Sequence, residues 1–148
     1  MSNKRIDENV AEIEKHLRRI DYTIRKKGRE IISEANITIP QFQALQILIH
    51  NEKLTIGELS QKMALACSTI TDLIDRMEKS ELVIRQKSEK DKRVVIVEVL
   101  PKGHDILEKV LRKRREYLKG KISHYDLNSL EVLRRELETL HEAIDKND

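Results

Sequence analysis

RQKSEKDKRVVIVEVLPKG, residues 85–103, is the stretch of sequence that decides the fold. A charged segment leads there into a run of β-branched residues, Val94–Val97, which favours a strand over a helix. With residues 82–84 as a first strand and residues 94–100 as a second, the stretch predicts a hairpin. The connection, residues 88–92, is too long for a two-residue turn, so it must project from the hairpin.

The hairpin is strongly basic. Its charged residues through position 93 are Arg85, Lys87, Lys90, Lys92, Arg93, Glu89 and Asp91. Five cations against two anions leave +3 within nine residues, which equals the formal net charge of the whole chain. The bulk charge is therefore a weak argument for a nucleic-acid partner, whereas its concentration in one projecting loop is a stronger one.

Composition places the rest of the chain in the α-rich class. Of the 148 residues, 37% are charged and 39% hydrophobic, with four Gly and two Pro, which predicts one domain or one compact unit with helical extensions. Aromatic residues make up only 3%, so any core must be aliphatic. A helix-rich chain with so few aromatic residues often completes its core by oligomerising.

Targeting signals and disulfides are not expected. The first ten residues, MSNKRIDENV, lack the apolar core of a signal peptide, and no apolar run is long enough to span a membrane. Cys67 is the single cysteine, which excludes an internal disulfide. We therefore expect a soluble, cytoplasmic protein.

Heptad stripes at both ends of the chain favour a helical dimer. In residues 6–24 the apolar side chains alternate in steps of four and three, the pattern of a helix that packs on a partner helix. The same pattern fills residues 127–144 behind Asp126, a plausible N-cap, and a third stripe in residues 106–122 predicts a helix between them. Packing within the monomer explains one stripe equally well, but two stripes at opposite termini favour dimerisation.

The middle of the chain consists of short helices. Residues 38–41 (Thr-Ile-Pro-Gln) and 55–58 (Thr-Ile-Gly-Glu) are capping boxes, the second opening a helix through Met63. A tight connection, residues 64–67, then precedes a helix that starts at Ser68. Two short helices joined in this way form a helix-turn-helix candidate, although helical hairpins are common.

The helix STITDLIDRMEKS, residues 68–80, has one apolar and one polar face. Its apolar stripe is Ile70, Leu73, Ile74 and Met77. Its polar face carries Ser68, Asp72, Asp75 and Lys79, flanked by Thr69, Thr71 and Arg76. These side chains can bond to base edges or phosphates, although a solvated face is the plain alternative. The projecting basic loop that follows, placed as a wing against phosphate, favours DNA binding.

Three segments in this order closely resemble the MarR family of winged-helix transcriptional regulators. They are ITIPQFQALQIL (37–48), LTIGELSQKMALACSTITDLIDRMEKSELVIR (54–85) and SEKDKRVVIVEVLPKG (88–103). The shared motifs are Thr-x-x-Glu-Leu, Ser-Thr-x-Thr, Asp-Arg-hydrophobic-Glu and the Asp-x-Arg of the wing. The resemblance implies a mainly α fold with a small β-hairpin, in which a winged helix-turn-helix is flanked by N- and C-terminal dimerisation helices.

The resemblance also implies a domain division and a function. Residues 1–36 would form the N-terminal dimerisation helix, residues 37–100 the DNA-binding region and residues 101–148 the C-terminal dimerisation helices, all in one intertwined domain. The implied function is that of a homodimeric repressor on a pseudo-palindromic double-stranded operator. A small aromatic or anionic effector would release it, and we expect neither a cofactor nor an enzymatic activity.

Carried over residue by residue, the resemblance implies a set of DNA contacts. Recognition-helix contacts would come from Ser68, Thr69, Thr71 and Arg76. Arg93, supported by Asp91, would enter the minor groove, where a narrow A·T-rich segment attracts arginine. The full set of expected DNA-binding residues is Ser68, Thr69, Thr71, Asp72, Arg76, Arg85, Lys87, Lys90, Lys92 and Arg93.

Four positions depart from the family pattern. Glu81 stands where a Gly usually ends the recognition helix, and Pro101 replaces a Thr at the start of the next helix. Lys92 keeps the wing basic without a planar guanidinium. Asp72 stands where a basic residue is common, so the operator cannot be inferred from relatives; an i, i+4 pair with Arg76 is an alternative role.

Other classes of function remain as alternatives. The five histidines are scattered without metal-site spacing and Gly is too scarce for a phosphate loop, which disfavours an enzyme or a metal sensor. Cys67 could act as a redox switch at a helix N-terminus, against the plain interpretation of a small residue that fills a turn. The basic run at residues 112–115 fits a solvated or dimer-bridging face better than a second DNA site. A winged helix can also dock a protein instead of DNA.

Overall fold

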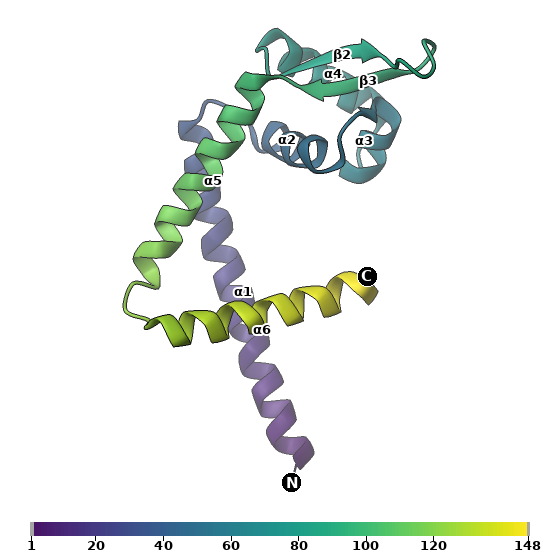
Figure 1. Cartoon of the computed structure of the whole chain (residues 1–148). Helices are drawn as coiled ribbons and strands as arrows, with labels where there is room; N and C mark the ends of the chain where they lie inside the picture. The colour runs from purple at the N-terminus through teal and green to yellow at the C-terminus, as the bar shows by residue number, and fades with distance from the viewer. Residues whose placement is uncertain (1, 148) are drawn as a thin grey trace. The chain divides into compact units, whose positions relative to one another are not determined.

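The computed structural model describes residues 2–147. In chain order the elements are α1 (Ser2–Glu34), α2 (Ile39–Asn51), β1 (Leu54–Thr55), α3 (Ile56–Met63), α4 (Cys67–Lys79), β2 (Val83–Lys87), β3 (Val95–Val99), α5 (Pro101–Lys121) and α6 (Leu127–Asn147) (Figure 1). The chain forms two compact units, residues 1–113 and residues 114–148. The mainly helical fold with a small sheet is the one that the sequence predicts. Within the described residues, no helix is both long and apolar enough to cross a membrane.

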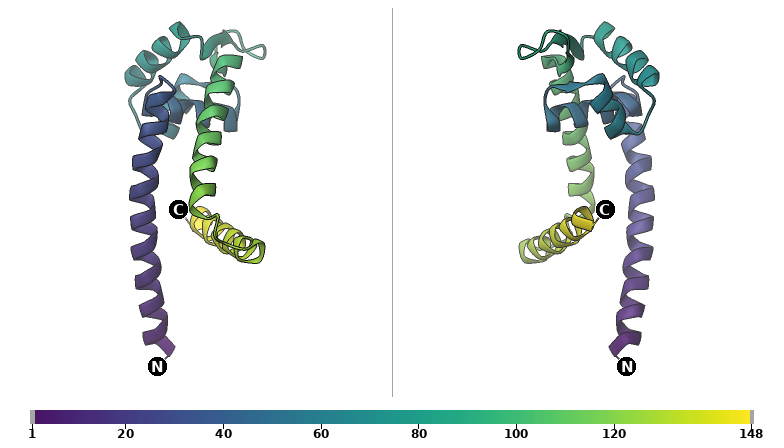
Figure 2. Two further views of the ribbon diagram at one scale, coloured as in Figure 1. Left: turned by 90° about the vertical axis from the view of Figure 1, so that its left-hand side faces the viewer. Right: turned by 90° about the vertical axis from the view of Figure 1, so that its right-hand side faces the viewer.

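Helix α1 is a long rod whose C-terminal end alone is buried. Of its 33 residues, only Ile31 and Ile32 are buried, and Figure 2 shows the helix continuing far beyond them. Most of the N-terminal heptad stripe is therefore exposed, from 59% at Ile6 to 40% at Leu17. An exposed apolar stripe along a 33-residue helix requires some other surface to cover it.

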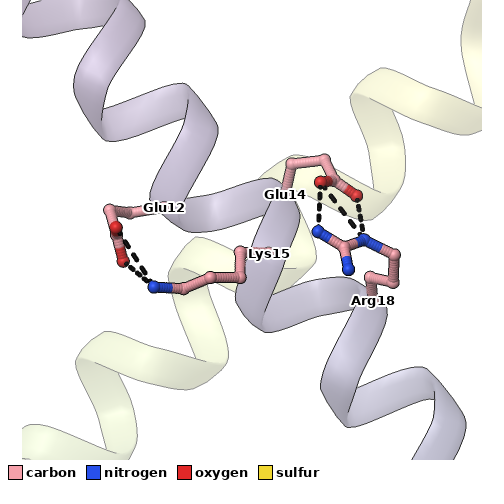
Figure 3. A network of polar contacts seen from close by, with 4 residues as sticks. All are labelled: Glu12, Glu14, Lys15 and Arg18. Carbon is pink, nitrogen blue, oxygen red and sulfur yellow. Dashed lines mark hydrogen bonds and ion pairs between the residues drawn. The ribbon is translucent and has the colours of Figure 1, made fainter.

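Ion pairs along α1 stabilise this exposed helix. Arg18 donates from Nε to Glu14 Oε2 at 3.0 Å and from Nη2 to Glu14 Oε1 at 3.0 Å (Figure 3). Lys15 lies 2.9 Å from Glu12 on the same helix. Such i, i+3 and i, i+4 pairs between exposed side chains contribute little to stability, so they support the helix without replacing packing against another surface.

Helices α2, α3 and α4 enclose one core with the sheet, which is aliphatic apart from Phe42 and Met77. Both predicted capping boxes are present: Thr38 accepts from Gln41 N at 3.2 Å, and Thr55 accepts from Glu58 N at 3.1 Å. The core itself consists of side chains from α1, α2, α3, α4, all three strands and α5, with Ile37 and Leu82 from the connections between them. It comprises Ile31, Ile32, Ile37, Phe42, Ala44, Leu45, Leu48, Leu54, Leu59, Ile70, Ile74, Met77, Leu82, Val83, Val97, Leu107 and Val110.

The sheet has three antiparallel strands in the order β1-β3-β2. The hairpin register pairs Val83 with Val99 and Lys87 with Val95. Strand β1 was not predicted, because Thr55 is both its last residue and the N-cap of α3. The first hairpin strand lies further along the chain than predicted, at Val83–Lys87 instead of residues 82–84.

The face of β3 is less buried than its sequence suggests. The pattern predicts that its alternate valines all pack inward, and Val97 is fully buried while Val99 is half-buried. Val95, however, is 42% exposed. It is the first residue of the strand, next to the loop, and the prediction was wrong for this residue.

Helix α4 ends in a Schellman motif that uses Glu81. Leu82 N donates to Met77 O at 2.9 Å and Glu81 N donates to Glu78 O at 3.0 Å. Glu81 has φ 62°, the left-handed conformation that glycine adopts without strain. Burial of both Leu82 and Met77 completes the motif, so α4 ends at Lys79 although no glycine stands at position 81.

Helix α5 packs against the sheet through Gly103. The helix begins at Pro101, as predicted, and Gly103 is buried in its first turn. A Cβ at this position would lie 2.5 Å from Leu82 O and 2.7 Å from Val99 Cγ1. Only glycine therefore allows the helix and the hairpin to approach this closely.

The second unit contains the end of α5 and all of α6. Asp126 caps α6 as predicted, since its Oδ1 accepts from Ser129 N at 2.7 Å, and this bond lowers the pKa of the Asp126 carboxyl. Within the described part of α6 no side chain is buried, and its apolar stripe is exposed, with Leu137 and Ile144 both at 49%. Like α1, this helix has an exposed apolar stripe that no other part of the described chain buries.

Candidate nucleic-acid interface

The polar face of α4 is open to solvent. Ser68, Thr69, Asp72 and Arg76 are all exposed, while Ile70, Ile74 and Met77 on the opposite face are buried. The helix begins at Cys67, one residue earlier than predicted, because Ala66 serves as the N-cap without a side-chain hydrogen bond. The apolar face fixes the helix in the core, and its polar residues are therefore displayed on a rigid support.

Thr71 differs from the other hydroxyl residues of this face. It is half-buried, and its Oγ1 donates to Cys67 O at 2.9 Å, one turn earlier. Because the hydroxyl proton is used within the helix, the oxygen is left as an acceptor. Thr71 is thus suited to accept a hydrogen bond from a partner, whereas the hydroxyls of Ser68 and Thr69 can both donate and accept.

Arg85 of β2 joins the hairpin to α4. Its Nε donates to Glu78 Oε2 at 3.0 Å, and its Nη2 also contacts Asp75 Oδ1 and lies 3.0 Å from Glu78 Oε2. The side chain is 31% exposed, so the ion pairs are partly shielded from water. Hydrogen bonding to Asp75, with that to Glu78, raises the pKa of the Arg85 guanidinium. The planar fork bridges two carboxylates at once, which fixes the helix relative to the first strand of the hairpin.

The loop between β2 and β3 extends beyond the rest of the sheet (Figure 1). Its base is closed by Ser88 N donating to Val94 O at 2.8 Å, and Val94 N donates to Asp91 O at 3.0 Å. These two bonds give a defined shape to the loop, which contains Lys90, Lys92 and Arg93.

Arg93 lies in this loop and is held by Asp91. Its Nε donates to Asp91 Oδ1 at 3.1 Å, its Nη2 to Oδ2 at 3.2 Å, and its backbone N to Oδ1 at 3.0 Å. These bonds, led by those from the guanidinium, lower the pKa of the Asp91 carboxyl. Even so, the Arg93 side chain remains 90% exposed. The carboxylate therefore orients the guanidinium while leaving it accessible.

The three lysines of the hairpin, Lys87, Lys90 and Lys92, are exposed to solvent. Lys87 is the last residue of β2, and Lys90 and Lys92 lie in the loop. Among residues 2–147, none of these three forms an ion pair. The exposed face of α4 thus offers hydroxyls and one guanidinium, and the hairpin offers a cluster of cations.

Potential metal and redox groups are sparse in the described part of the chain. No group of three or more His, Cys, Asp or Glu side chains there could hold a metal ion. Cys67 is exposed as a free thiol at the first residue of α4.

Comparisons with known proteins identify the fold and its family. The model of the MarR family matches residues 37–95. YsmB of Bacillus subtilis (strain 168), an HTH-type transcriptional regulator, is 49% identical over 130 residues, which cover 88% of this chain and 89% of YsmB. The chain belongs to the MarR family.

Two other comparisons agree with this assignment. The organic hydroperoxide resistance transcriptional regulator of Bacillus subtilis (strain 168) is 34% identical over 79% of this chain and 81% of that protein. A MarR family protein from Bacillus stearothermophilus has a structure that matches with a TM-score of 0.85 and 44% identity, over 94% of this chain and 97% of that one. The chain is therefore a transcriptional regulator of the MarR family, with its winged helix.

The structure brings the predicted site residues of this MarR-family chain into two groups. Ser68, Thr69, Asp72 and Arg76 share the exposed face of α4, with Thr71 at its edge. Lys87 at the end of β2 and Lys90, Lys92 and Arg93 in the loop form the second group. Arg85 lies in neither group, because Asp75 and Glu78 hold its guanidinium. Sequence reasoning missed this bridge. The available signal was that Asp75 and Glu78 lie three residues apart and share one side of the helix.

Proposed function

We propose that this chain is a homodimeric repressor that binds a pseudo-palindromic operator in double-stranded DNA. The observation that carries the proposal is the presence of both an exposed polar face on α4 and an exposed arginine, oriented by Asp91, in the loop between β2 and β3. Helix α4 would lie in the major groove, where Ser68, Thr69 and Arg76 offer hydrogen bonds to bases and phosphates. Arg93 would enter the adjacent minor groove, and Lys90 and Lys92 would contact phosphates.

Dimerisation is supported by the exposed apolar stripes. Ile6, Val10 and Ile13 on α1 are each more than half exposed, and the stripe on α6 is open as well. A second copy of the chain offers the same stripes, so self-association would cover both. Two recognition helices would then contact half-sites whose centres lie one turn of DNA apart, about 34 Å.

Release by a small aromatic or anionic effector completes the proposal. A ligand that prefers one spacing of the two DNA-binding regions would shift the population of dimers away from the form that fits DNA. The test is a DNA-binding isotherm with and without each member of a panel of aromatic acids. If no ligand in a broad panel changes the affinity for DNA, control by an effector is wrong, and repression would depend on the level of the protein.

Sedimentation and salt dependence test the core of this proposal. We expect a dimer at micromolar concentration, and deletion of residues 1–24 should abolish both the dimer and tight binding to DNA. The affinity should fall steeply as salt rises, because the hairpin lysines displace counterions from phosphates. A monomer that binds DNA with full affinity would contradict the dimer. An affinity that salt does not change would instead favour a winged helix that docks a protein.

A redox-responsive regulator is the second candidate. One relative is named for organic hydroperoxide resistance, and Cys67 is exposed at the first residue of α4. A peroxide-dependent loss of DNA binding in the parent that Cys67→Ser abolishes would favour this candidate. Equal responses of the parent and the variant would exclude a role for the thiol.

A further inference from the structure

Helix α4 carries three carboxylates on or beside its polar face, and Arg85 engages two of them. Asp75 and Glu78 both contact the guanidinium, and their side chains are 44% and 34% exposed. One cation of the same chain thus holds both carboxylates and offsets part of their negative charge. Asp72, one turn before Asp75, has no contact with Arg85.

Asp72 is the unpaired acid of the face. It is exposed, and among residues 2–147 it forms no hydrogen bond or ion pair. The i, i+4 pair with Arg76, which the sequence offered as an alternative, is not formed in the structure. Both side chains are therefore free to meet a partner in the groove.

An unpaired carboxylate on a DNA-binding face has an electrostatic cost. Phosphates repel it, and burying it against DNA removes its water, so the cost remains unless a donor meets it. Among the groups in the major groove, only exocyclic amino groups donate: N4 of cytosine and N6 of adenine. Next to the adenine amino group lies N7, an acceptor that repels a carboxylate, whereas cytosine has no acceptor on that edge.

We propose that Asp72 is a specificity-determining residue that accepts a hydrogen bond from the N4 amino group of one cytosine in each operator half-site. The inference rests on the proposed function, since it requires α4 to lie in the major groove. Asp72 excludes guanine and thymine at this position, because their groove edges present acceptors to the carboxylate. Arg85 supports the discrimination indirectly: because it holds Asp75 and Glu78 in ion pairs, Asp72 is left as the carboxylate that is free to contact a base.

The test combines base and residue changes on a duplex that the parent protein selects from random DNA. Each cytosine of a half-site is replaced in turn by 2-pyrimidinone, which lacks the 4-amino group. Binding is measured for the parent, for Asp72→Ala and for Glu89→Ala. Glu89 is an exposed acid of the hairpin loop, so its variant removes the same charge without removing an acceptor from α4.

At one cytosine per half-site, we expect the parent and Glu89→Ala to lose affinity about tenfold on loss of the amino group. Asp72→Ala should bind both duplexes equally. Asp72→Asn should shift the selected base at that position towards adenine, which offers both a donor and an acceptor to the amide.

Failure of this inference and failure of the proposed function would give different results. If Asp72→Ala shows the same loss as the parent at every cytosine, the inference is overturned, although the DNA-binding function stands. If the parent selects no sequence from the random duplexes, the proposed function itself fails.

Discussion

Replacing Gly103 with alanine should destabilise the protein, although the same change elsewhere in its helices should stabilise it. The added Cβ would lie 2.5 Å from Leu82 O, 2.7 Å from Val99 Cγ1 and 3.1 Å from Leu45 Cδ2. The first of these atoms cannot move easily, because Leu82 O also accepts a hydrogen bond from Leu100 N at 2.9 Å. The clash is thus against backbone that holds the hairpin to the next segment.

The two contributions to the free energy of unfolding can be compared. Overpacking a well-packed site costs about 1–3 kcal/mol, and a fixed carbonyl places Gly103 at the upper end. Alanine gains about 1 kcal/mol over glycine in a helix interior. We therefore expect a net loss of about 2 kcal/mol for Gly103→Ala. Gly28, in α1, has no atom within 4 Å of its added Cβ, so Gly28→Ala should gain up to about 1 kcal/mol.

Urea unfolding followed by circular dichroism measures both variants. All proteins must be compared at one concentration, because association couples to unfolding. The expected difference between the two alanine variants is about 3 kcal/mol, the sum of the loss and the gain. A Gly103→Ala variant at least as stable as the parent would refute the close approach of α5 to the hairpin.

Four further predictions concern single residues. Glu81→Gly should raise the free energy of unfolding by up to about 1 kcal/mol, since it relieves a left-handed conformation, whereas Glu81→Ala should not; equal urea midpoints for both variants would contradict this. Arg85→Ala should weaken DNA binding without changing its salt dependence, because the guanidinium positions α4; a salt slope lower by about 1 would make Arg85 a phosphate contact instead. Alkylation of Cys67 with a bulky maleimide should block DNA binding, while Cys67→Ser should bind like the parent and resist the reagent; an alkylated protein with unchanged affinity would place the thiol away from DNA. Because Arg93 lowers the pKa of Asp91, the contacts between them should be intact above the ordinary Asp pKa of about 3.9. They should be lost only as the pH falls through the lower pKa that Asp91 has in the folded protein. If NMR shows Asp91 titrating at or above the ordinary pKa, the pair is not formed in solution.

Local signals in the sequence predicted much of the fold. Thr38 and Thr55 each precede a glutamine or glutamate by three residues, and both capping boxes formed. The β-branched run after the charged loop predicted the hairpin, and Asp126 predicted the start of α6. Each of these signals acts within a few residues of chain, which is why sequence alone was sufficient.

Features that depend on distant partners could not be predicted. The length of β2 is set by its pairing with β3 and not by its own residues, so it extends to Lys87. Strand β1 exists only because Leu54 and Thr55 pair with Val97 and Ile96. The role of Arg85 depends on carboxylates seven and ten positions earlier, across the end of a helix. Which predicted site residues contact DNA stays a prediction.

Selection of duplexes from random DNA by the purified chain, followed by footprinting of the bound sequences, tests the central claim most directly. We predict that the chain selects an imperfect palindrome and protects two half-sites with centres about one helical turn, ~34 Å, apart. Protection should include the minor groove beside each half-site, where Arg93 would lie, and Arg93→Ala should lose that flanking protection, with the larger loss of affinity on A·T-rich flanks. Recovery of no common sequence, or of one half-site bound by a single chain, would contradict the account.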